Sequence, residues 1–279
     1  MRKIISLTVL AFAVAFSGCS TMSAPKTQGG VAIEKTVAAY KIASYVDVET
    51  AKSKLTEQGF DIVGMYKPAE NGTTILYTSA AMKADVNKPS RGLNAIGRIL
   101  VDDERKQISI ANPVYFGAAF MQEQYNHAVA SAVLGSLEKA FGPLKNSEDQ
   151  WEYTGLAGYH FMVGMPYYKD MDIVGEGSTA DLVAKAKAAK GTTAVVQIGE
   201  DRYVAFVELD KRTNGFVKKI GTQNGEILPW AVLIEGGKAK ALNAQYFIAV
   251  SYPLLTMTEF MGIATMPGAI TKGLEKLFK

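Results

Sequence analysis

The sequence contains an internal repeat, and a repeat restricts a chain to folds that can be built twice. Residues 112–118 (Asn-Pro-Val-Tyr-Phe-Gly-Ala) correspond to residues 243–249 (Asn-Ala-Gln-Tyr-Phe-Ile-Ala), 131 residues later. The same offset joins further pairs without a gap: Val101 with Val232, Glu104 with Glu235, and Ile42 with Ile173. Residues 137–141 match residues 274–278 at a slightly larger offset, so the second copy contains a short insertion. We therefore expect two similar units.

Each unit is expected to begin with a strand and a capped amphipathic helix. Asp47 and Ser178 have short side chains that can accept hydrogen bonds from the first N–H groups of a helix. Apolar residues recur behind them with helical spacing over residues 48–58 and 179–189. Apolar segments separated by polar turns follow, which predicts antiparallel hairpins. The expected strands cover residues 36–44, 60–66, 73–79, 95–101 and 107–112, and then 168–174, 193–198, 203–209, 230–235 and 239–243.

Each unit is expected to end with a second amphipathic helix, over residues 127–141 and 267–279. The sequence thus predicts an α+β fold of two similar units. Each unit would be an antiparallel sheet with helices packed on one face, and the two would form a pseudo-dimer. The first unit covers residues 36–142 and the second residues 168–279, joined by a junction at 143–167 that includes an added strand at 159–165.

The N-terminus has the pattern of a bacterial lipoprotein signal. Arg2 and Lys3 precede a short apolar run, and Cys19 follows Ser17 and Gly18, whose small side chains suit a cleavage site. We expect residues 1–18 to be a signal peptide, Cys19 to carry the lipid, and residues 19–35 to be a flexible tether. The alternative is an ordinary secretory signal that is cleaved elsewhere. Because Cys19 is the only cysteine, lipidation would leave no thiol for redox or metal chemistry.

A lipid on Cys19 predicts that the protein is attached to a membrane and faces the periplasm. Ser20 occupies the position where, in similar lipoproteins, an aspartate retains the protein at the inner membrane, so the outer membrane is expected. The formal net charge is only +3, without a dense basic run, which argues against a nucleic-acid partner. The expected partners are therefore the membrane, through the lipid, and a small apolar ligand or an envelope protein.

Short motifs in each unit resemble a known family. Gly59-Phe60 ends a predicted helix, Asn112-Pro113 ends a strand before an aromatic pair, and Leu228-Pro229 opens a strand. These features resemble tandem copies of the domain of unknown function 302, over residues 36–142 and 168–279. The first copy lacks the Leu-Pro pair, having Gly97-Arg98, and the second lacks the proline after Asn243. The resemblance implies a small α+β domain and no particular chemistry.

The sequence offers few residues for catalysis or metal binding. His127 and His160 are the only histidines, too few and too far apart for a zinc site of about four ligands. His160 and Met162 alternate along the chain and suit Cu(I), or haem, as a minor hypothesis, although methionine more often fills a core. Asp102 and Asp103 fall in a predicted turn, where we expect solvated carboxylates. No cofactor is expected.

Aromatic pairs recur at the same place in both copies and are the best candidates for a ligand site. Tyr115 and Phe116 correspond to Tyr246 and Phe247, and each pair follows an asparagine, Asn112 or Asn243. These residues could line a pocket between the copies, or pack a helix onto the sheet, with the asparagines capping the helices. The sequence favours a non-enzymatic binding or envelope-associated module. A hydrolase-like enzyme with its site between the repeats remains the alternative.

Overall fold

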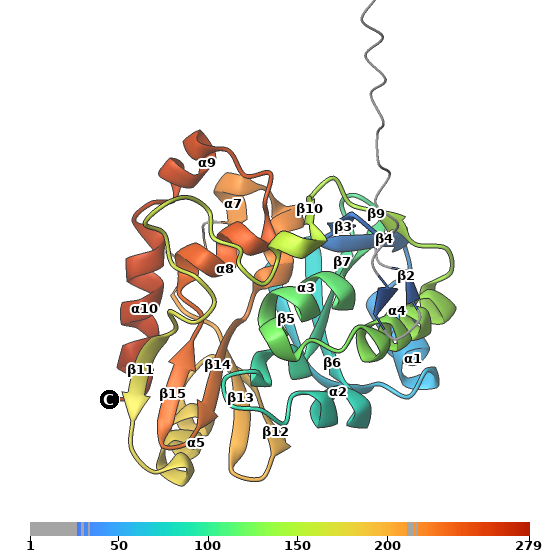
Figure 1. Ribbon diagram of the computed structural model, residues 1–279. Coiled ribbons are helices and arrows are strands. Elements are labelled where there is room, and N and C mark those ends of the chain that lie inside the picture. The colour runs from blue at the N-terminus through green and yellow to red at the C-terminus, as the bar shows by residue number, and fades with distance from the viewer. Residues whose placement is uncertain (1–26, 29–30, 33, 211–214, 216) are drawn as a thin grey trace, which may run out of the picture.

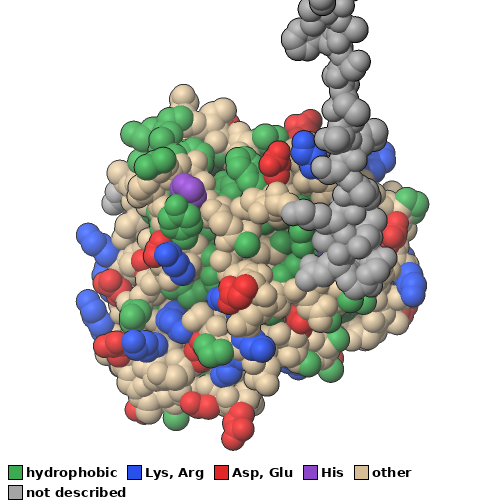
Figure 2. Space-filling model, in the orientation of Figure 1, with side chains coloured by type: hydrophobic (Ala, Val, Ile, Leu, Met, Phe, Trp, Pro, Cys, Tyr) green, Lys and Arg blue, Asp and Glu red, His purple; other side chains and the backbone are tan. Residues whose placement is uncertain are grey.

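The computed structural model describes residues 27–28, 31–32, 34–210, 215 and 217–279. Helices and antiparallel strands occur in two neighbouring units, which confirms the predicted α+β class. In Figure 1 the first unit is coloured blue to green and the second yellow to red. Figure 2 shows the same face in space-filling form, where positive and negative side chains are interspersed over the second unit. The expected signal peptide, Cys19 and most of the tether lie outside the described residues.

The two main sheets have the same strand order. The first sheet consists of β4 (Tyr40–Ser44), β5 (Asp61–Ala69), β6 (Gly72–Thr78), β7 (Gly97–Asp102), β8 (Gln107–Ala111) and β9 (Lys145–Asn146). The second consists of β11 (Asp172–Glu176), β12 (Thr192–Gly199), β13 (Arg202–Val207), β14 (Trp230–Glu235) and β15 (Lys238–Ala241). The first sheet has the order β5-β6-β7-β8-β4, with β9 added beyond β4, and the second has the order β12-β13-β14-β15-β11. Corresponding strands therefore occupy corresponding places, although the pseudo-dimer arrangement stays a prediction.

Two helices cover the outer face of each sheet. They are α1 (Val48–Glu57) and α4 (His127–Phe141) in the first unit, and α5 (Thr179–Ala188) and α10 (Met266–Leu277) in the second. In the first unit Leu55 and Leu137 pack against Ile75 and Ile99 in one buried cluster. Within the described residues, no helix is both long enough and apolar enough to cross a bilayer.

The remaining elements are short. They are β1 (Thr27–Gln28), β2 (Val31–Ala32), β3 (Thr36–Ala38), α2 (Ala80–Asp85), η1 (Gly92–Ala95), α3 (Pro113–Met121), η2 (Gln122–Gln124), β10 (Gln150–Glu152), η3 (Tyr153–Gly155), α7 (Val217–Ile220), η4 (Thr222–Ile227), α8 (Ala244–Ser251) and α9 (Met257–Gly262). The elements named η are 3₁₀ helices. Strand β1 pairs with β2, and β3 pairs with β10.

The predicted helix caps are present in both units. The side chain of Asp47 accepts a hydrogen bond from the Thr50 N–H (2.8 Å), and that of Ser178 accepts one from the Asp181 N–H (3.1 Å). Each bond satisfies an N–H group that has no partner within its own helix. These caps place α1 and α5 directly after the first strand of each sheet.

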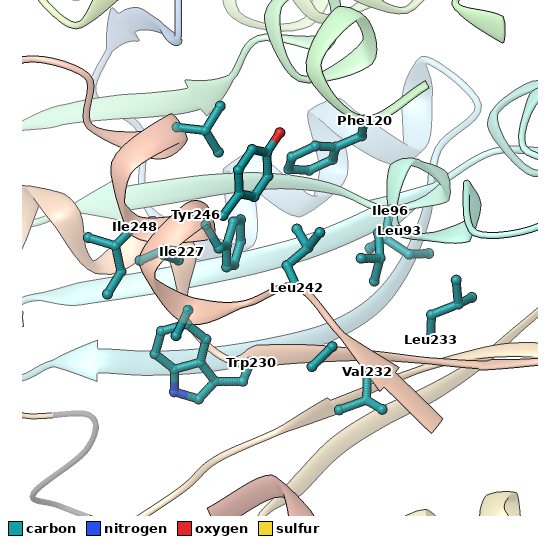
Figure 3. Packing of buried hydrophobic residues seen from close by; sticks show 14 of the residues in the cluster. Leu93, Ile96, Phe120, Ile227, Trp230, Val232, Leu233, Leu242, Tyr246 and Ile248 are labelled. Carbon is teal, nitrogen blue, oxygen red and sulfur yellow. The ribbon is translucent and has the colours of Figure 1, made fainter. Parts of the chain in front are cut away.

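At the inner faces of the two sheets, a short helix of each unit packs against the sheet of the other unit. Helix η1 of the first unit packs against β13 and β14, and η4 of the second unit packs against β6 and β7. Figure 3 shows the result: Leu93 and Phe120 of the first unit lie among Trp230, Leu242 and Tyr246 of the second. The apolar core is therefore continuous across the seam between the units.

Three sequence-based predictions are corrected by the structure. Residues 159–165 form turns and bends instead of a strand, because Gly164 adopts a positive φ and Pro166 follows. The expected first strand at 36–44 is divided between β3 and β4, which belong to different sheets. Its counterpart, expected at 168–174, starts only at Asp172.

The register of the β14–β15 hairpin differs from the predicted alignment. Asp102 pairs with Gln107 at the end of β7, and Glu235 pairs with Lys238 at the end of β14. Asp102 is therefore the counterpart of Glu235, and the predicted pairs Val101–Val232 and Glu104–Glu235 are wrong. The turn of the second hairpin contains two fewer residues, which an ungapped alignment misses.

The fit of Tyr77 against β7 gives a stability prediction. A Cβ atom added to Gly97 would lie 2.2 Å from Cζ of the fully buried Tyr77, so Gly97→Ala should destabilise the fold by about 1–3 kcal/mol. In α4, a Cβ at Gly135 would meet no atom within 4 Å, and Gly135→Ala should stabilise by about 0.5–1 kcal/mol. Urea denaturation of both variants measures the difference, and equal effects would contradict this packing.

Candidate ligand-binding site

Arg98 of β7 holds the second unit against the first sheet. Its guanidinium donates hydrogen bonds to the main-chain oxygens of Glu226 (3.1 Å), Ile227 and Pro229 (3.0 Å). The same group lies over the rings of Phe206 and Phe247, at 5.4 and 5.7 Å from their centroids. The segment that includes η4 is thus fixed by a buried cation that bonds to carbonyl groups.

Glu226 is a buried carboxyl group at this seam. Its Oε2 accepts a hydrogen bond from the Ser109 hydroxyl (2.6 Å), while Oε1 has no hydrogen-bond partner within the described part of the chain. Burial raises the pKa of Glu226 to about 8, although the Ser109 hydrogen bond and the Arg98 charge act in the opposite direction. Arg98 moderates this shift only partly because it bonds to main-chain oxygens and not to the carboxylate.

An apolar cavity of about 90 Å³ lies between the units. Phe116 and Phe120 line it from the first unit, and Trp230 and Phe247 from the second. Phe116 and Phe247 thus line a cavity at the seam, and their role in binding a ligand stays a prediction. A cavity of roughly 150 Å³ is needed to hold benzene, so this one has room for only a few atoms.

The other predicted ligand residues have structural contacts. The Tyr115 hydroxyl donates to the main-chain oxygen of Val250 (2.8 Å). The buried ring of Tyr246 lies edge-on to those of Tyr159 and Tyr168, and its hydroxyl has no hydrogen-bond partner within the described residues. Asn112 accepts from the Val114 N–H (3.0 Å), and Asn243 accepts from the Gln245 N–H (3.0 Å); both therefore cap helices. Their second amide atoms are also occupied, by the main-chain oxygen of Ala38 and by a carboxylate oxygen of Asp172.

A second and larger hollow, which we call the seam cleft, has a volume of about 610 Å³. Its first wall is the inner face of the first sheet, with the β7–β8 turn and the segment after β9 (Tyr40, Ile42, Leu100, Asp102, Arg105, Gln107, Ser109 and residues 146–149). Its second wall belongs to the second unit (Ile220, Gln223, Asn224, Tyr252, Leu254, Leu255 and Glu259). Pockets that bind small molecules have volumes of roughly 300–1,000 Å³.

Asp102 lies in the seam cleft with one carboxylate oxygen unused. Its Oδ1 accepts hydrogen bonds from the N–H groups of Glu104 (3.0 Å) and Arg105 (2.9 Å), which fixes the β7–β8 turn. Its Oδ2 is buried and has no hydrogen-bond partner within the described residues. The prediction that Asp102 is a solvated turn residue is therefore wrong, because only 3% of it is exposed.

The two histidines have separate sets of contacts. The Nδ1 atom of His127 contacts the Tyr125 hydroxyl (3.1 Å) and its Nε2 contacts the Ser131 hydroxyl (3.2 Å), one turn further along α4. A catalytic triad would place a carboxylate on one of these nitrogens. His160 packs its ring against Tyr167, with centroids 4.4 Å apart.

Met162, the other expected copper ligand, is partly exposed in the same loop as His160. Among the described residues, no group of three or more His, Cys, Asp or Glu side chains is placed to hold a metal ion. Copper or haem binding near His160 stays a prediction.

Sequence reasoning missed the three polar residues that define the seam. Arg98 and Glu226 come close only in the folded chain, because they belong to different units. Asp102 could have been found from the repeat, since its counterpart Glu235 also ends a strand with an acidic residue. The shorter second turn concealed this correspondence.

The raised pKa of Glu226 predicts a pH-dependent stability. An unfolded chain ionises this group near its ordinary pKa of 4.5, whereas the folded chain retains the proton until about pH 8. Burying the protonated Glu226 carboxyl group therefore costs no free energy of folding through ionisation below pH 4.5. Above that pH the unfolded chain gains stability by ionising, so the free energy of unfolding decreases as pH rises towards 8. Glu226→Gln cannot ionise, so its stability advantage over the wild type should increase from pH 5 to pH 8.

The expected difference at pH 8 is on the order of a few kcal/mol, because one pKa unit corresponds to about 1.4 kcal/mol. Denaturant titrations at several pH values measure it. Glu104→Gln, an exposed control in the β7–β8 turn, should follow the wild type. A constant difference between Glu226→Gln and the wild type across this range would show that Glu226 is ionised in the folded state.

The chain matches no family model, no curated protein and no solved structure. The resemblance to the domain of unknown function 302 therefore stays a prediction from short motifs. The contacts of Arg98, Glu226 and Asp102 are the observations on which a functional proposal for this chain can be built.

Proposed function

We propose that the protein is a non-enzymatic, membrane-anchored binding module whose ligand occupies the seam cleft. The observation that carries the proposal is the cleft itself, whose volume of about 610 Å³ suits a small organic molecule. Both units contribute to its walls, which is where ligand sites tend to form. Tyr40 and Tyr252, one from each unit, have stacked rings with centroids 5.8 Å apart at this site.

The character of the cleft favours a polar ligand over the apolar one expected from the sequence. The seam cleft is lined by charged and amide side chains such as Asp102, Arg105 and Asn224, whereas the apolar cavity measures only about 90 Å³. A buried polar atom without a partner is unfavourable, so a ligand that bonds to Asp102 Oδ2 gains free energy on binding.

A binding role is supported over hydrolysis by the environment of the titratable groups. His127 is buried and both of its ring nitrogens contact hydroxyl groups. Burial lowers its pKa, and it does not line the seam cleft. The carboxyl group of Glu226 does not line the seam cleft, and its hydrogen bond with Ser109 joins the two units.

We also propose that the lipid on Cys19 holds the module at the outer membrane, on the periplasmic side. The support is the sequence pattern around Cys19 and the serine that follows it. Two or three acyl chains anchor a protein stably, since each buried methylene contributes about 0.8 kcal/mol.

Ligand binding in the seam cleft can be tested by screening small polar fragments against the full chain, isotope-labelled and in detergent. We expect two-dimensional NMR to show hits that shift the amide signals of residues lining the cleft, such as Ile42, Asn224 and Leu255. Signals from the surface of α5, such as that of Lys187, provide the control. A screen that shifts no cleft signal, or only signals elsewhere, would contradict the proposed function.

The anchor can be tested by fractionating cells of a bacterial host that express the full chain. The wild type should be labelled by palmitate and remain with the outer membrane. Cys19→Ala should lose the label, and its membrane-bound fraction should decrease by more than about tenfold, because the acyl chains that hold it are absent. Ser20→Asp should retain the label and move to the inner membrane, and Thr21→Ala serves as the matched control. Palmitate labelling of Cys19→Ala would contradict the proposed anchor.

A further inference from the structure

The repeat places two carboxylates at equivalent positions, one in each sheet. Asp102 is the last residue of β7 and Glu235 the last residue of β14, and each faces the start of the neighbouring strand. By the strand registers, Gly72 stands opposite Asp102, while Arg202 stands opposite Glu235. In the same way Ser109 of β8 corresponds to Lys240 of β15, because they pair with Leu100 and Leu233. The second unit therefore shows what a carboxylate at this position can bind.

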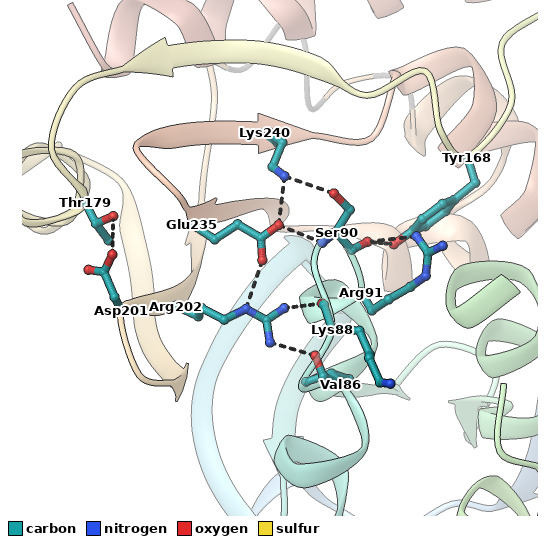
Figure 4. A network of polar contacts seen from close by, with 10 residues as sticks. All are labelled: Val86, Lys88, Ser90, Arg91, Tyr168, Thr179, Asp201, Arg202, Glu235 and Lys240. Atoms are coloured by element: carbon teal, nitrogen blue, oxygen red, sulfur yellow. Dashed lines mark hydrogen bonds and ion pairs between the residues drawn. The ribbon is translucent and has the colours of Figure 1, made fainter. Parts of the chain in front are cut away.

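Glu235 is surrounded by cations of its own unit. Its Oε1 accepts from Lys240 Nζ (2.7 Å) and its Oε2 from Arg202 Nε (2.9 Å). The main-chain N–H of Ser90, from the first unit, adds a third hydrogen bond of 2.6 Å. Figure 4 shows these contacts, together with those that join Arg202 to the main chain of Val86 and Lys88. The site on the second sheet is thus occupied by the chain itself.

Asp102 has neither cation, because a glycine and a serine stand where Arg202 and Lys240 stand in the second unit. Its Oδ2 is buried, lacks a hydrogen-bond partner within the described residues, and belongs to a side chain that lines the seam cleft. On the first sheet the equivalent carboxylate therefore borders a cavity of about 610 Å³ and has no such network of cations. What Asp102 Oδ2 lacks is a hydrogen-bond donor, and beside Glu235 the donors are cations.

The side chains that line the seam cleft carry a net negative charge, which also favours a cationic ligand. Besides Asp102, the carboxylates of Glu148, Asp149 and Glu259 line the cleft, against the single cation Arg105. Arg105, Glu148 and Glu259 are exposed, so their charges are screened by solvent, whereas the Asp102 carboxylate is buried. The tyrosine pair of the cleft adds aromatic rings, which attract organic cations.

Building on the proposed function, we propose that the seam cleft binds a small organic cation with an ammonium or guanidinium group, which donates to Asp102 Oδ2. The ligand takes the place that Lys240 and Arg202 take beside Glu235. An organic cation fits better than a metal ion, because no group of three or more His, Cys, Asp or Glu side chains converges within the described ranges.

Three probes of the same chain length test the charge preference. Isothermal titration of the full chain in detergent, at pH 7 and low salt, compares butane-1,4-diamine with butane-1,4-diol and with succinate. We expect the diamine to bind and the other two to bind at least tenfold more weakly, because only the diamine can donate a charge-assisted hydrogen bond to Asp102.

Two variants test the role of Asp102, with a matched control. Asp102→Asn keeps an oxygen to accept from Glu104 and Arg105 but loses the charge, and it should weaken diamine binding about tenfold or more. Gly72→Arg introduces the guanidinium of the second unit; its Cβ meets only ordinary contacts, the nearest at 3.4 Å to Leu100. It should abolish diamine binding and raise the melting temperature. Glu104→Gln, which removes one exposed charge from the same turn, should change the affinity less than twofold.

The outcomes separate this inference from the proposed function. Tighter binding of succinate or the diol, or unchanged diamine affinity in Gly72→Arg, would overturn the cation assignment and leave a ligand site in the cleft. Failure of all three probes, while other fragments shift cleft signals in the NMR screen, would also overturn the cation assignment alone. If Asp102→Asn does not fold, Gly72→Arg decides the question by itself.

Discussion

One buried cation, Arg98, attaches the second unit to the inner face of the first sheet. A guanidinium keeps its proton inside a protein, so its burial requires compensating dipoles or charges. Three main-chain oxygens at residues 226, 227 and 229 and two aromatic rings provide this compensation. Because these oxygens belong to the segment that includes η4, Arg98 fixes that segment on the first sheet. This attachment also positions Asn224, whose main-chain oxygen accepts a hydrogen bond from the Tyr252 hydroxyl. Both residues belong to one wall of the seam cleft.

Local structure could be predicted from the sequence because it is determined by neighbouring residues. The helix at 127–141 and the caps at Asp47 and Ser178 depend on apolar spacing and on one short side chain each, and all are confirmed. The division of residues 36–44 into two strands depends instead on pairing with β10 and β8, which lie far along the chain. Long-range pairing of this kind leaves no periodic signal in a short window.

The candidate site was harder to predict than the fold, because its residues are brought together by the seam. The repetition of the aromatic pairs predicts a ligand site, yet Tyr115 and Tyr246 are buried within the core. The sequence predicts an exposed Asp102, because acidic residues in turns usually face solvent. Its burial results from contacts that the sequence of one unit does not contain, namely the covering of the first sheet by residues of the second.

The two equivalent carboxylate sites, at Asp102 and at Glu235, differ in their neighbours, and this difference affects how such a protein can evolve. In a dimer of identical chains, every substitution appears on both sides of the symmetry axis, so a lysine that fills one carboxylate site would fill the other as well. Joining the copies in one chain removes this restriction. Lys240 and Arg202 can complete one half as a rigid support, while Ser109 and Gly72 leave the other half free to acquire specificity.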